Sequence, residues 1–220
     1  MIDLHTHTFF SDGELIPSEL VRRAEARGYR AVAITDHVDH SNYTFVIDRV
    51  WEAVRILNQE SSLIVIPGVE ITHTPPARIP ELIERCREAG ALLVVVHGET
   101  IVEPVAPGTN RAAIEGKADI LAHPGLISKD EVILAKENGV YLELTTRRGH
   151  SITNGYVAKL ATKVGAQMVI NTDAHSPGDL VDRSFAIKVG IGAGLTLAQV
   201  EECFINSEQI VKRLTPKLKG

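Results

Sequence analysis

The chain has 220 residues, of which 44% are hydrophobic and 23% charged, and its formal net charge is −5. This composition is ordinary for a globular protein and excludes a disordered, collagen-like or coiled-coil chain. The acidic balance argues against broad binding of nucleic acid through a basic face. The longest apolar runs fall far short of the ~20 residues that a membrane helix needs. The N-terminal sequence MIDLHTHTFF does not have the pattern of a signal peptide.

The two cysteines, Cys86 and Cys203, are far apart in the sequence and belong to no CxxC pair. They therefore indicate neither a disulfide framework nor a zinc ribbon. We expect one domain over residues 1–220, in a reducing, cytoplasmic setting and without membrane association. The oligomeric state is left open.

Short apolar runs alternate with amphipathic segments. Each run is apolar throughout and does not alternate with polar residues, which is typical of strands buried on both faces of a parallel sheet. We predict strands at Ile2–His5, Ala31–Thr35, Leu63–Pro67, Leu92–Val96, Ile120–Ala122, Val140–Leu144 and Met168–Asn171. We predict helices, most of them followed by a glycine, at Pro17–Arg27, Phe45–Gln59, Ile79–Glu88, Lys129–Asn138, Asn154–Val164 and Leu197–Arg213. About seven strand–helix units favour a barrel of the α/β class.

Two glycine-containing stretches lie outside these elements. The segment Gly98–Gly108 is the longest irregular stretch and follows a predicted strand, so we consider it a candidate lid. The segment Gly190–Gly194 follows no clear strand, and we interpret it as a tight turn before the last helix. Ser11 and Cys86 have no base and orienting group at a recognisable spacing, which disfavours a serine or cysteine nucleophile.

Side chains that can bind metal ions stand at or near the end of every predicted strand. They are His5 and His7, Asp36 and His37, Glu70, His97, His123, Glu143, and Asp173 and His175. In a barrel of alternating strands and helices, the carboxyl ends of the strands form the face that carries active sites. This placement predicts a metal centre with more than one ion.

The spacing of these residues supports that prediction. His5 and His7 are two residues apart on a strand and so point to the same face, and Asp173 and His175 repeat the spacing. Imidazole and carboxylate ligands without a thiolate suit zinc, manganese or iron. The candidate ligands are too many for one ion and fit two or three divalent ions, with Glu70 as a bridge: His5, His7, Asp12, His37, Glu70, His97, His123, Asp173 and His175.

The expected charge of the centre points to an anionic substrate. Three divalent ions outweigh the carboxylates of Asp12, Glu70 and Asp173 and a bridging hydroxide, so a centre with three ions favours phosphate oxygens. Arg147 and Arg148 follow the sixth predicted strand and are candidates for a guanidinium fork on phosphate, with one of the two expected to point inward. His150 is a candidate substrate contact, its alternative being a loop histidine. His40 and His73 are interpreted as surface or loop residues.

Two acidic residues are candidates for supporting roles. Asp36 either fixes the tautomer of His37 or caps a helix N-terminus. Glu143 either orients a ligand or forms a structural ion pair.

The motifs DLHTHTFFSDG, AITDH, GVE, AHPG and NTDAH occur in this order, with His97 at a strand end between them. In this combination, from residue 3 to about residue 178, the chain resembles the PHP (polymerase and histidinol phosphatase) superfamily. The resemblance implies a distorted (β/α)7 barrel of the TIM type, a trinuclear metal centre and phosphoesterase activity. Among its members, stand-alone histidinol-phosphate phosphatases are the most similar in size, and this chain is somewhat shorter.

The resemblance also implies how the ligands divide among the ions. One ion would be held by His5, His7, Glu70 and Asp173. A second would be held by Glu70, His97 and His123, and a third by Asp12, His37 and His175. The catalytic set implied for this chain is His5, His7, Glu70, Asp173 and His175.

We therefore expect a metal-dependent phosphomonoesterase of histidine biosynthesis that hydrolyses a small phosphate ester, histidinol phosphate being the favoured substrate. Attack by a hydroxide activated at the divalent ions would cleave the ester. A nucleotide phosphatase or exonuclease-like phosphoesterase shares the same ligands and stays open. An amidohydrolase-type enzyme that cleaves C–N bonds also stays open, although that group commonly uses a carbamylated lysine where this chain has Glu70, His97 or His123. The remaining alternative is a non-catalytic metal-binding module.

Overall fold

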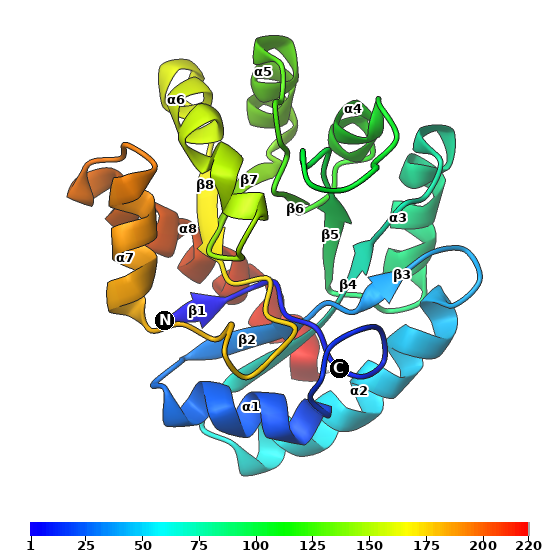
Figure 1. Ribbon diagram of the computed structural model, residues 1–220. Helices are drawn as coiled ribbons and strands as arrows, with labels where there is room; N and C mark the ends of the chain where they lie inside the picture. The colour runs from blue at the N-terminus through cyan, green and yellow to red at the C-terminus, as the bar shows by residue number, and fades with distance from the viewer. Residues whose placement is uncertain (220) are drawn as a thin grey trace.

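Parallel strands form a ring surrounded by helices in the computed structural model, which describes residues 1–219 (Figure 1). The strands are β1 (Ile2–Asp3), β2 (Ala31–Ile34), β3 (His37–Val38), β4 (Ile64–Ile71), β5 (Leu93–His97), β6 (Ile120–Ala122), β7 (Tyr141–Thr145) and β8 (Met168–Asn171). Their order is β1-β2-β4-β5-β6-β7-β8, with β3 paired to β4, and every pairing is parallel. A bridge between Thr6 and Ala174 joins the two ends of the sheet. The fold is a distorted (β/α)7 barrel, as predicted.

The helices connect successive strands on the outside of the ring, except that β3 follows β2 directly and that α7 and α8 both follow β8. They are α1 (Pro17–Ala26), α2 (Tyr43–Glu60), α3 (Ile79–Glu88), α4 (Thr109–Glu115), α5 (Lys129–Asn138), α6 (Asn154–Val164), α7 (Arg183–Gly192) and α8 (Leu197–Leu214). Local sequence explains several of their ends. Ser128 and Thr196 begin α5 and α8 with reciprocal side-chain caps, and Gly139 and Gly165 end α5 and α6 in the left-handed conformation.

The alternating direction of side chains along the strands produces two apolar cores and also directs polar side chains into the barrel. Successive side chains of a strand point to opposite faces, so one set fills the barrel and the other packs under the helices. The inward set includes Ile66, Leu93, Val95, Ile120 and Val169. The same parity continues along these strands and β7 to Glu70, His97, Glu143 and Asn171. The apolar residues thus fill the lower barrel, and the polar ones enter its carboxyl end.

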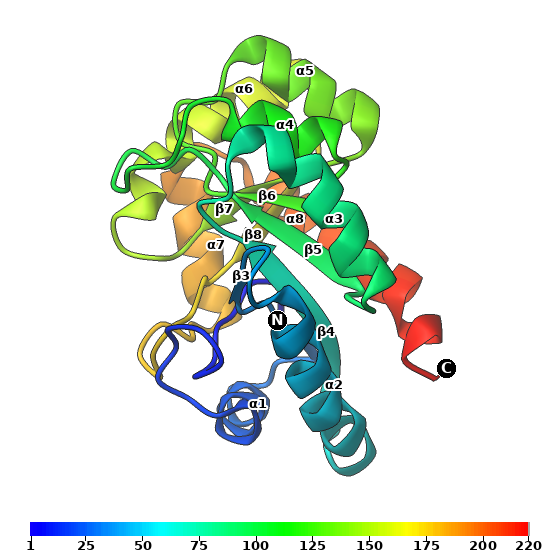
Figure 2. The same cartoon turned by 90° about the vertical axis from the view of Figure 1, so that its right-hand side faces the viewer.

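Helix α8 covers the end of the barrel at which the strands begin. Its residues Ile210, Val211 and Leu214 belong to the same apolar cluster as Ile2 and Ala31. Figure 2 shows α8 and the C-terminal end of the chain on one side of the molecule, with the loops that follow the strands on the other. Helix α8 therefore packs against the apolar end, and the polar end faces the connecting loops.

Several predicted boundaries were wrong. Strand β4 runs through Pro67 to Ile71, so Glu70 lies within a strand. The predicted turn at Gly190–Gly194 is largely helical, because α7 extends to Gly192. Gly190 has a packing role there, since a Cβ atom would lie 2.6 Å from Cγ2 of Val200 on α8. Helix α4 and strand β3 were missed, since each is too short for its periodicity to be recognised.

None of the helices within residues 1–219 is both long and apolar enough to cross a membrane.

Candidate metal centre

The predicted ligands converge at the carboxyl end of the barrel. His5 and His7 follow β1, His37 begins β3, Glu70 lies in β4 and His97 ends β5. The others lie in the loops after β1, β6 and β8, and they are Asp12, His123, Asp173 and His175. All of them except Asp12, His37 and His175 are buried. The topology therefore assembles the set, which is scattered over most of the sequence, at one end of the barrel.

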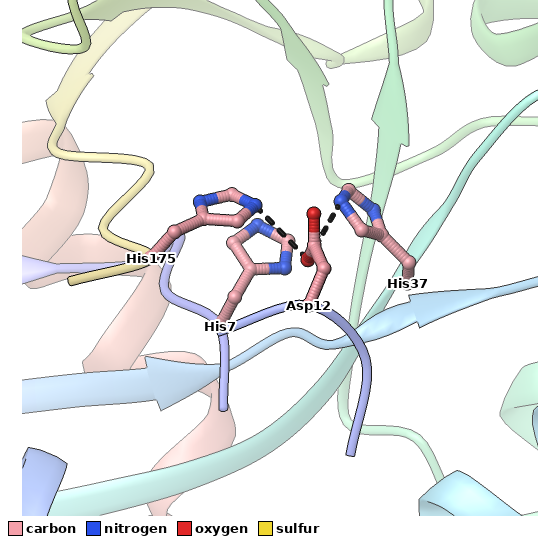
Figure 3. Close-up of side chains that lie close together, drawn as sticks. All are labelled: His7, Asp12, His37 and His175. Carbon is pink, nitrogen blue, oxygen red and sulfur yellow. Dashed lines mark ion pairs between the residues drawn. The ribbon is translucent and has the colours of Figure 1, made fainter. Parts of the chain in front are cut away.

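One group of candidate ligands lies at the outer edge of this site. The ligand atoms of His7, Asp12, His37 and His175 all lie within 4.8 Å of one another. Oδ1 of Asp12 lies 3.1 Å from Nε2 of His175 and 3.4 Å from Nε2 of His37, with the carboxylate between the two rings (Figure 3). The side chain of Asp12 is 57% exposed, so this group opens towards solvent.

Glu70 connects this outer group to the buried groups. Its Oε2 lies 2.8 Å from Nδ1 of His37 and 3.7 Å from Nε2 of His7. Its Oε1 lies 3.2 Å from Nε2 of His5 and 3.8 Å from Nε2 of His123. The two oxygens thus face different histidines, an arrangement that would suit a carboxylate shared between ions. His5 also contributes to two buried groups, one with His123 and Asp173 and the other with His7 and Glu70.

Unsatisfied buried atoms provide a test of whether metal ions fit these residues. Nε2 of His5, both ring nitrogens of His7, Oε1 of Glu70 and Nδ1 of His123 are buried without a hydrogen-bond partner. Leaving such atoms unpaired costs about 1–3 kcal/mol each. They lie in a cluster of imidazoles and carboxylates, the donor set that zinc, manganese and iron accept. The residues therefore fit divalent ions.

Electrostatics favour ligand-ready protonation states at two of these side chains. Burial acts to raise the pKa of Glu70, but the imidazoles of His5 and His37 bring it well below the usual value. Burial, together with His37 and His175, lowers the pKa of His7 well below its usual value. Metal ligation requires a carboxylate and a neutral imidazole, and these shifts favour both. Burial also raises the pKa of Asp173 to about 6, against the opposing effect of His5.

The backbone is strained at two of the candidate ligands. His123 has a φ of 25° and Asp173 a φ of 53°, in a region that residues other than glycine rarely adopt. Strain of this kind persists only where the surrounding structure enforces it, and it gathers at functional sites. His73, which lies after β4, has a φ of 50°.

Glu143 lies beside a candidate ligand. Its Oε2 is 2.8 Å from Nδ1 of His5, and both side chains are fully buried. This contact leaves Nε2 of His5 facing Glu70 and Asp173. This contact fits both roles considered for Glu143, orienting a candidate ligand and forming a structural ion pair.

Asp36 neither contacts the His37 ring nor caps a helix, the two roles that the sequence suggested. It accepts hydrogen bonds from the backbone and hydroxyl of Thr8, both at 2.7 Å, and from the hydroxyl of Ser11 at 2.8 Å. It precedes β3 and not a helix, so it is no helix cap, and Nδ1 of His37 contacts Thr72 Oγ1 at 2.6 Å. Asp36 therefore holds the turn after His7. The prediction was wrong because the partner segment lies about 25 residues away in sequence.

The two arginines and His150 occupy different environments. Arg147 donates to the carbonyl of Asp173 at 2.9 Å and contacts Nδ1 of His175, which places its guanidinium beside the centre. Arg148 is exposed. His150 is buried, with Nδ1 2.9 Å from Thr100 Oγ1. Of the predicted pair, Arg147 is the one that reaches the candidate ligands.

Sequence reasoning missed Glu103, Thr72 and Asn171. Asn171 donates to Glu143 Oε2 at 2.9 Å, and Glu103 lies 3.1 Å from Nε2 of His97. The parity of β8 could have identified Asn171 as inward-pointing. Glu103 carries no comparable signal, because it lies in an irregular loop.

Comparison with known proteins places this site in a family. The model of the PHP domain matches residues 3–146. An uncharacterized protein of Methanocaldococcus jannaschii is 52% identical over 215 residues, covering 96% of this chain and 99% of that protein. A protein of Shewanella amazonensis named a probable phosphatase is 28% identical over 214 residues, covering 84% of this chain and 82% of that protein.

Solved structures agree on the fold. A structure from Listeria monocytogenes, described as that of a candidate histidinol phosphatase, superposes with a TM-score of 0.62 at 13% sequence identity. The match covers 84% of this chain and 99% of that one. At this identity the likeness concerns the fold alone, but the family match extends over well over half of the sequence and includes Glu70, His97 and His123. The chain belongs to the PHP domain family.

Proposed function

We propose that this protein is a metal-dependent phosphomonoesterase acting on a small phosphate ester, with histidinol phosphate as the first candidate substrate. The observation that carries the proposal is the position of Arg147 beside a buried centre of imidazoles and carboxylates. Divalent ions would satisfy the buried unpaired atoms of such a centre, and a guanidinium at its edge favours an anion with several oxygens.

The ligands divide in the proposal as the family resemblance implies. One ion would be held by His5, His7, Glu70 and Asp173, a second by Glu70, His97 and His123, and a third by Asp12, His37 and His175. Bound divalent ions supply Lewis-acid stabilisation of phosphoryl charge and lower the pKa of water. Zinc, manganese and iron all suit this donor set.

The protein's own residues bind and orient the substrate. The guanidinium of Arg147 is fixed by the Asp173 carbonyl and the ring of His175, and its remaining N–H groups are suited to the non-bridging phosphate oxygens. Arg148 is exposed and is assigned a smaller part in phosphate binding. The buried side of the centre around His5 and Glu70 excludes water, which strengthens electrostatic interactions there.

The name of a relative and the residues and charge of this chain support the phosphate ester over the alternatives. A protein 28% identical to this chain is named a probable phosphatase. An amidohydrolase with a carbamylated lysine is disfavoured, because the strand-end positions carry Glu70, His97 and His123. A long nucleic-acid substrate is disfavoured by the net charge of −5, and a nucleotide is retained as an alternative within phosphoesterases.

A substrate panel tests the proposal. Protein loaded with manganese or zinc is assayed for phosphate release from histidinol phosphate, mononucleotides, short oligonucleotides and a chromogenic phosphate ester. Preference for histidinol phosphate supports the proposal in full, whereas preference for a nucleotide keeps the chemistry and changes the substrate. Release of no phosphate by protein with confirmed metal content would overturn it.

A further inference from the structure

A clamped loop carries an acidic side chain to the edge of the metal centre. The segment 98–108 connects β5 to α4, beside which it lies in Figure 1. Oε1 of Glu99 accepts from the backbone N–H of Gly108 at 3.0 Å and of Asn110 at 2.9 Å, and Oδ1 of Asn110 accepts from the N–H of Glu99 at 2.9 Å. These bonds tie the two ends of the loop together, so its exposed tip is held over the ends of the strands.

Glu103, in this tip, faces three histidines: His73 after β4, His97 at the end of β5 and His150 after β7. Its Oε2 lies 3.1 Å from Nε2 of His97 and 3.6 Å from Nε2 of His73, and its Oε1 lies 3.3 Å from Nε2 of His150. His97 and His150 are almost fully buried, whereas the carboxylate is 37% exposed. The ring of His150 stacks on that of His123, with centroids 4.3 Å apart. The group therefore adjoins the candidate ligands.

The hydrogen bonds of the two buried rings leave one nitrogen of each directed at Glu103. Nδ1 of His97 lies 3.1 Å from the carbonyl of Gly98, to which it can only donate, and Nδ1 of His150 lies 2.9 Å from Thr100 Oγ1. In the neutral His97 ring, Nε2 then carries a lone pair. A lone pair and a carboxylate oxygen at 3.1 Å repel each other unless a proton or a cation lies between them. Metal-bound histidines are usually oriented by this kind of bond at their other nitrogen.

We propose that Glu103 and His150 join His97 as ligands of a divalent ion, extending the metal centre beyond the residues of the PHP motifs. Two imidazoles and a carboxylate are a donor set for zinc, manganese or iron. The inference rests on the proposed metal centre. It also gives loop 98–108 a role, because an ion held by Glu103 would fasten the loop tip to the buried histidines.

The competing explanation is an ion pair between Glu103 and protonated histidines, without a metal. The two explanations differ in metal content and in the response of the loop to metal. Purified protein is stripped with a chelator and titrated with Zn²⁺ and, separately, Mn²⁺, and bound metal is counted by elemental analysis after equilibrium dialysis. Hydrogen exchange of the backbone amides in residues 101–106 is measured with and without the same ion.

Glu103→Gln is the informative variant, since it keeps the shape of the side chain and removes the charge. We expect the affinity for one of the bound ions to fall by about 10- to 100-fold or more. A loss of this size is seen even for residues that only orient a ligand. We also expect metal to slow exchange in the loop of the native protein and not in the variant. His150→Asn should lower the affinity for the same ion. The matched control is Glu115→Gln on α4, an exposed carboxylate 3.4 Å from Arg111, which should change neither quantity.

If Glu103→Gln changes neither the metal affinity nor the hydrogen exchange of the loop, the inference is overturned. The ion pair between Glu103 and protonated histidines is then the remaining explanation. Because Glu103 is partly exposed in a loop, the variant is expected to fold, and its thermal unfolding checks this. Glu103→Asp provides a second test, with an intermediate loss expected. Neither readout uses turnover. A loss of metal in Glu103→Gln without phosphatase activity in the native protein would uphold this inference and reject the proposed reaction.

Discussion

The side-chain amide of Asn171 donates a hydrogen bond to Oε2 of Glu143 at 2.9 Å, and that same oxygen lies 2.8 Å from Nδ1 of His5. Oδ1 of Asn171 also accepts the backbone N–H of Leu4 at 3.0 Å. One buried amide thus connects β7 and β8 to the segment that carries His5 and His7. The position where the barrel closes and the orientation of a candidate ligand depend on the same side chain.

Replacing Asn171 should therefore destabilise the fold. Asn171→Ala leaves the Leu4 N–H and one lone pair of Glu143 without a partner, at a cost of about 1–3 kcal/mol for each buried group. Urea unfolding followed by circular dichroism measures the change. Gln59→Ala, at an exposed position on α2, is the control and should stay within about 0.5 kcal/mol of the native protein. Equal stability of both variants would show that the closure does not depend on Asn171.

Glu143→Gln should weaken metal binding while the barrel stays folded. The amide keeps the size of the side chain, but it loses the charge that stabilises and orients His5. Loss of such a partner typically costs about 10- to 100-fold in metal affinity. Competition with a metal-binding dye measures the affinity. An affinity equal to that of the native protein would show that Glu143 has only a structural role.

Chelation should lower the melting temperature of the native protein. Ions that bind only the folded chain stabilise it by about 2.7 kcal/mol at a concentration 100 times their dissociation constant. For a domain of this size each kcal/mol corresponds to about 2–4 °C. Differential scanning calorimetry with and without chelator measures the shift, and re-addition of the metal should reverse it. A melting temperature independent of metal would contradict the metal centre.

Cys86 and Cys203 should be unreactive in the folded protein. Both are buried in the core under the helices, and burial raises the pKa of each thiol to about 12. At pH 8 almost no thiolate forms, and the reagent cannot reach either sulfur. Titration with a chromogenic disulfide should detect these thiols only after unfolding in guanidinium. Rapid reaction without denaturant would show that the helices open locally.

The fold followed from the sequence to the extent that its signals are local. The apolar runs at Ile120–Ala122 and Met168–Asn171 match strands β6 and β8, because a strand buried on both faces needs an uninterrupted apolar segment. Helix α7 was missed because Gly190 and Gly192 suggest a turn, whereas Gly190 allows close packing on Val200. Such packing depends on a partner helix that periodicity does not identify.

In the candidate site, too, the features with local sequence signals could be predicted and those that depend on distant partners could not. The ligand positions could be predicted because parallel strands bring their carboxyl ends to one face of a barrel. Asp36 was misassigned, and Glu103 and Thr72 were missed, because their contacts join loops that are distant in sequence. Short-range patterns locate a strand end, but they do not determine which loop folds over it.

The most direct test of the metal-dependent phosphoesterase is Glu70→Gln, measured for metal content and phosphate release on the same sample. Glu70 faces His5 and His123 with one oxygen and His7 and His37 with the other. We predict that the variant loses bound metal and that its turnover falls by at least about a hundredfold, the scale on which one key electrostatic group contributes to catalysis. Full metal content together with full turnover would contradict the account.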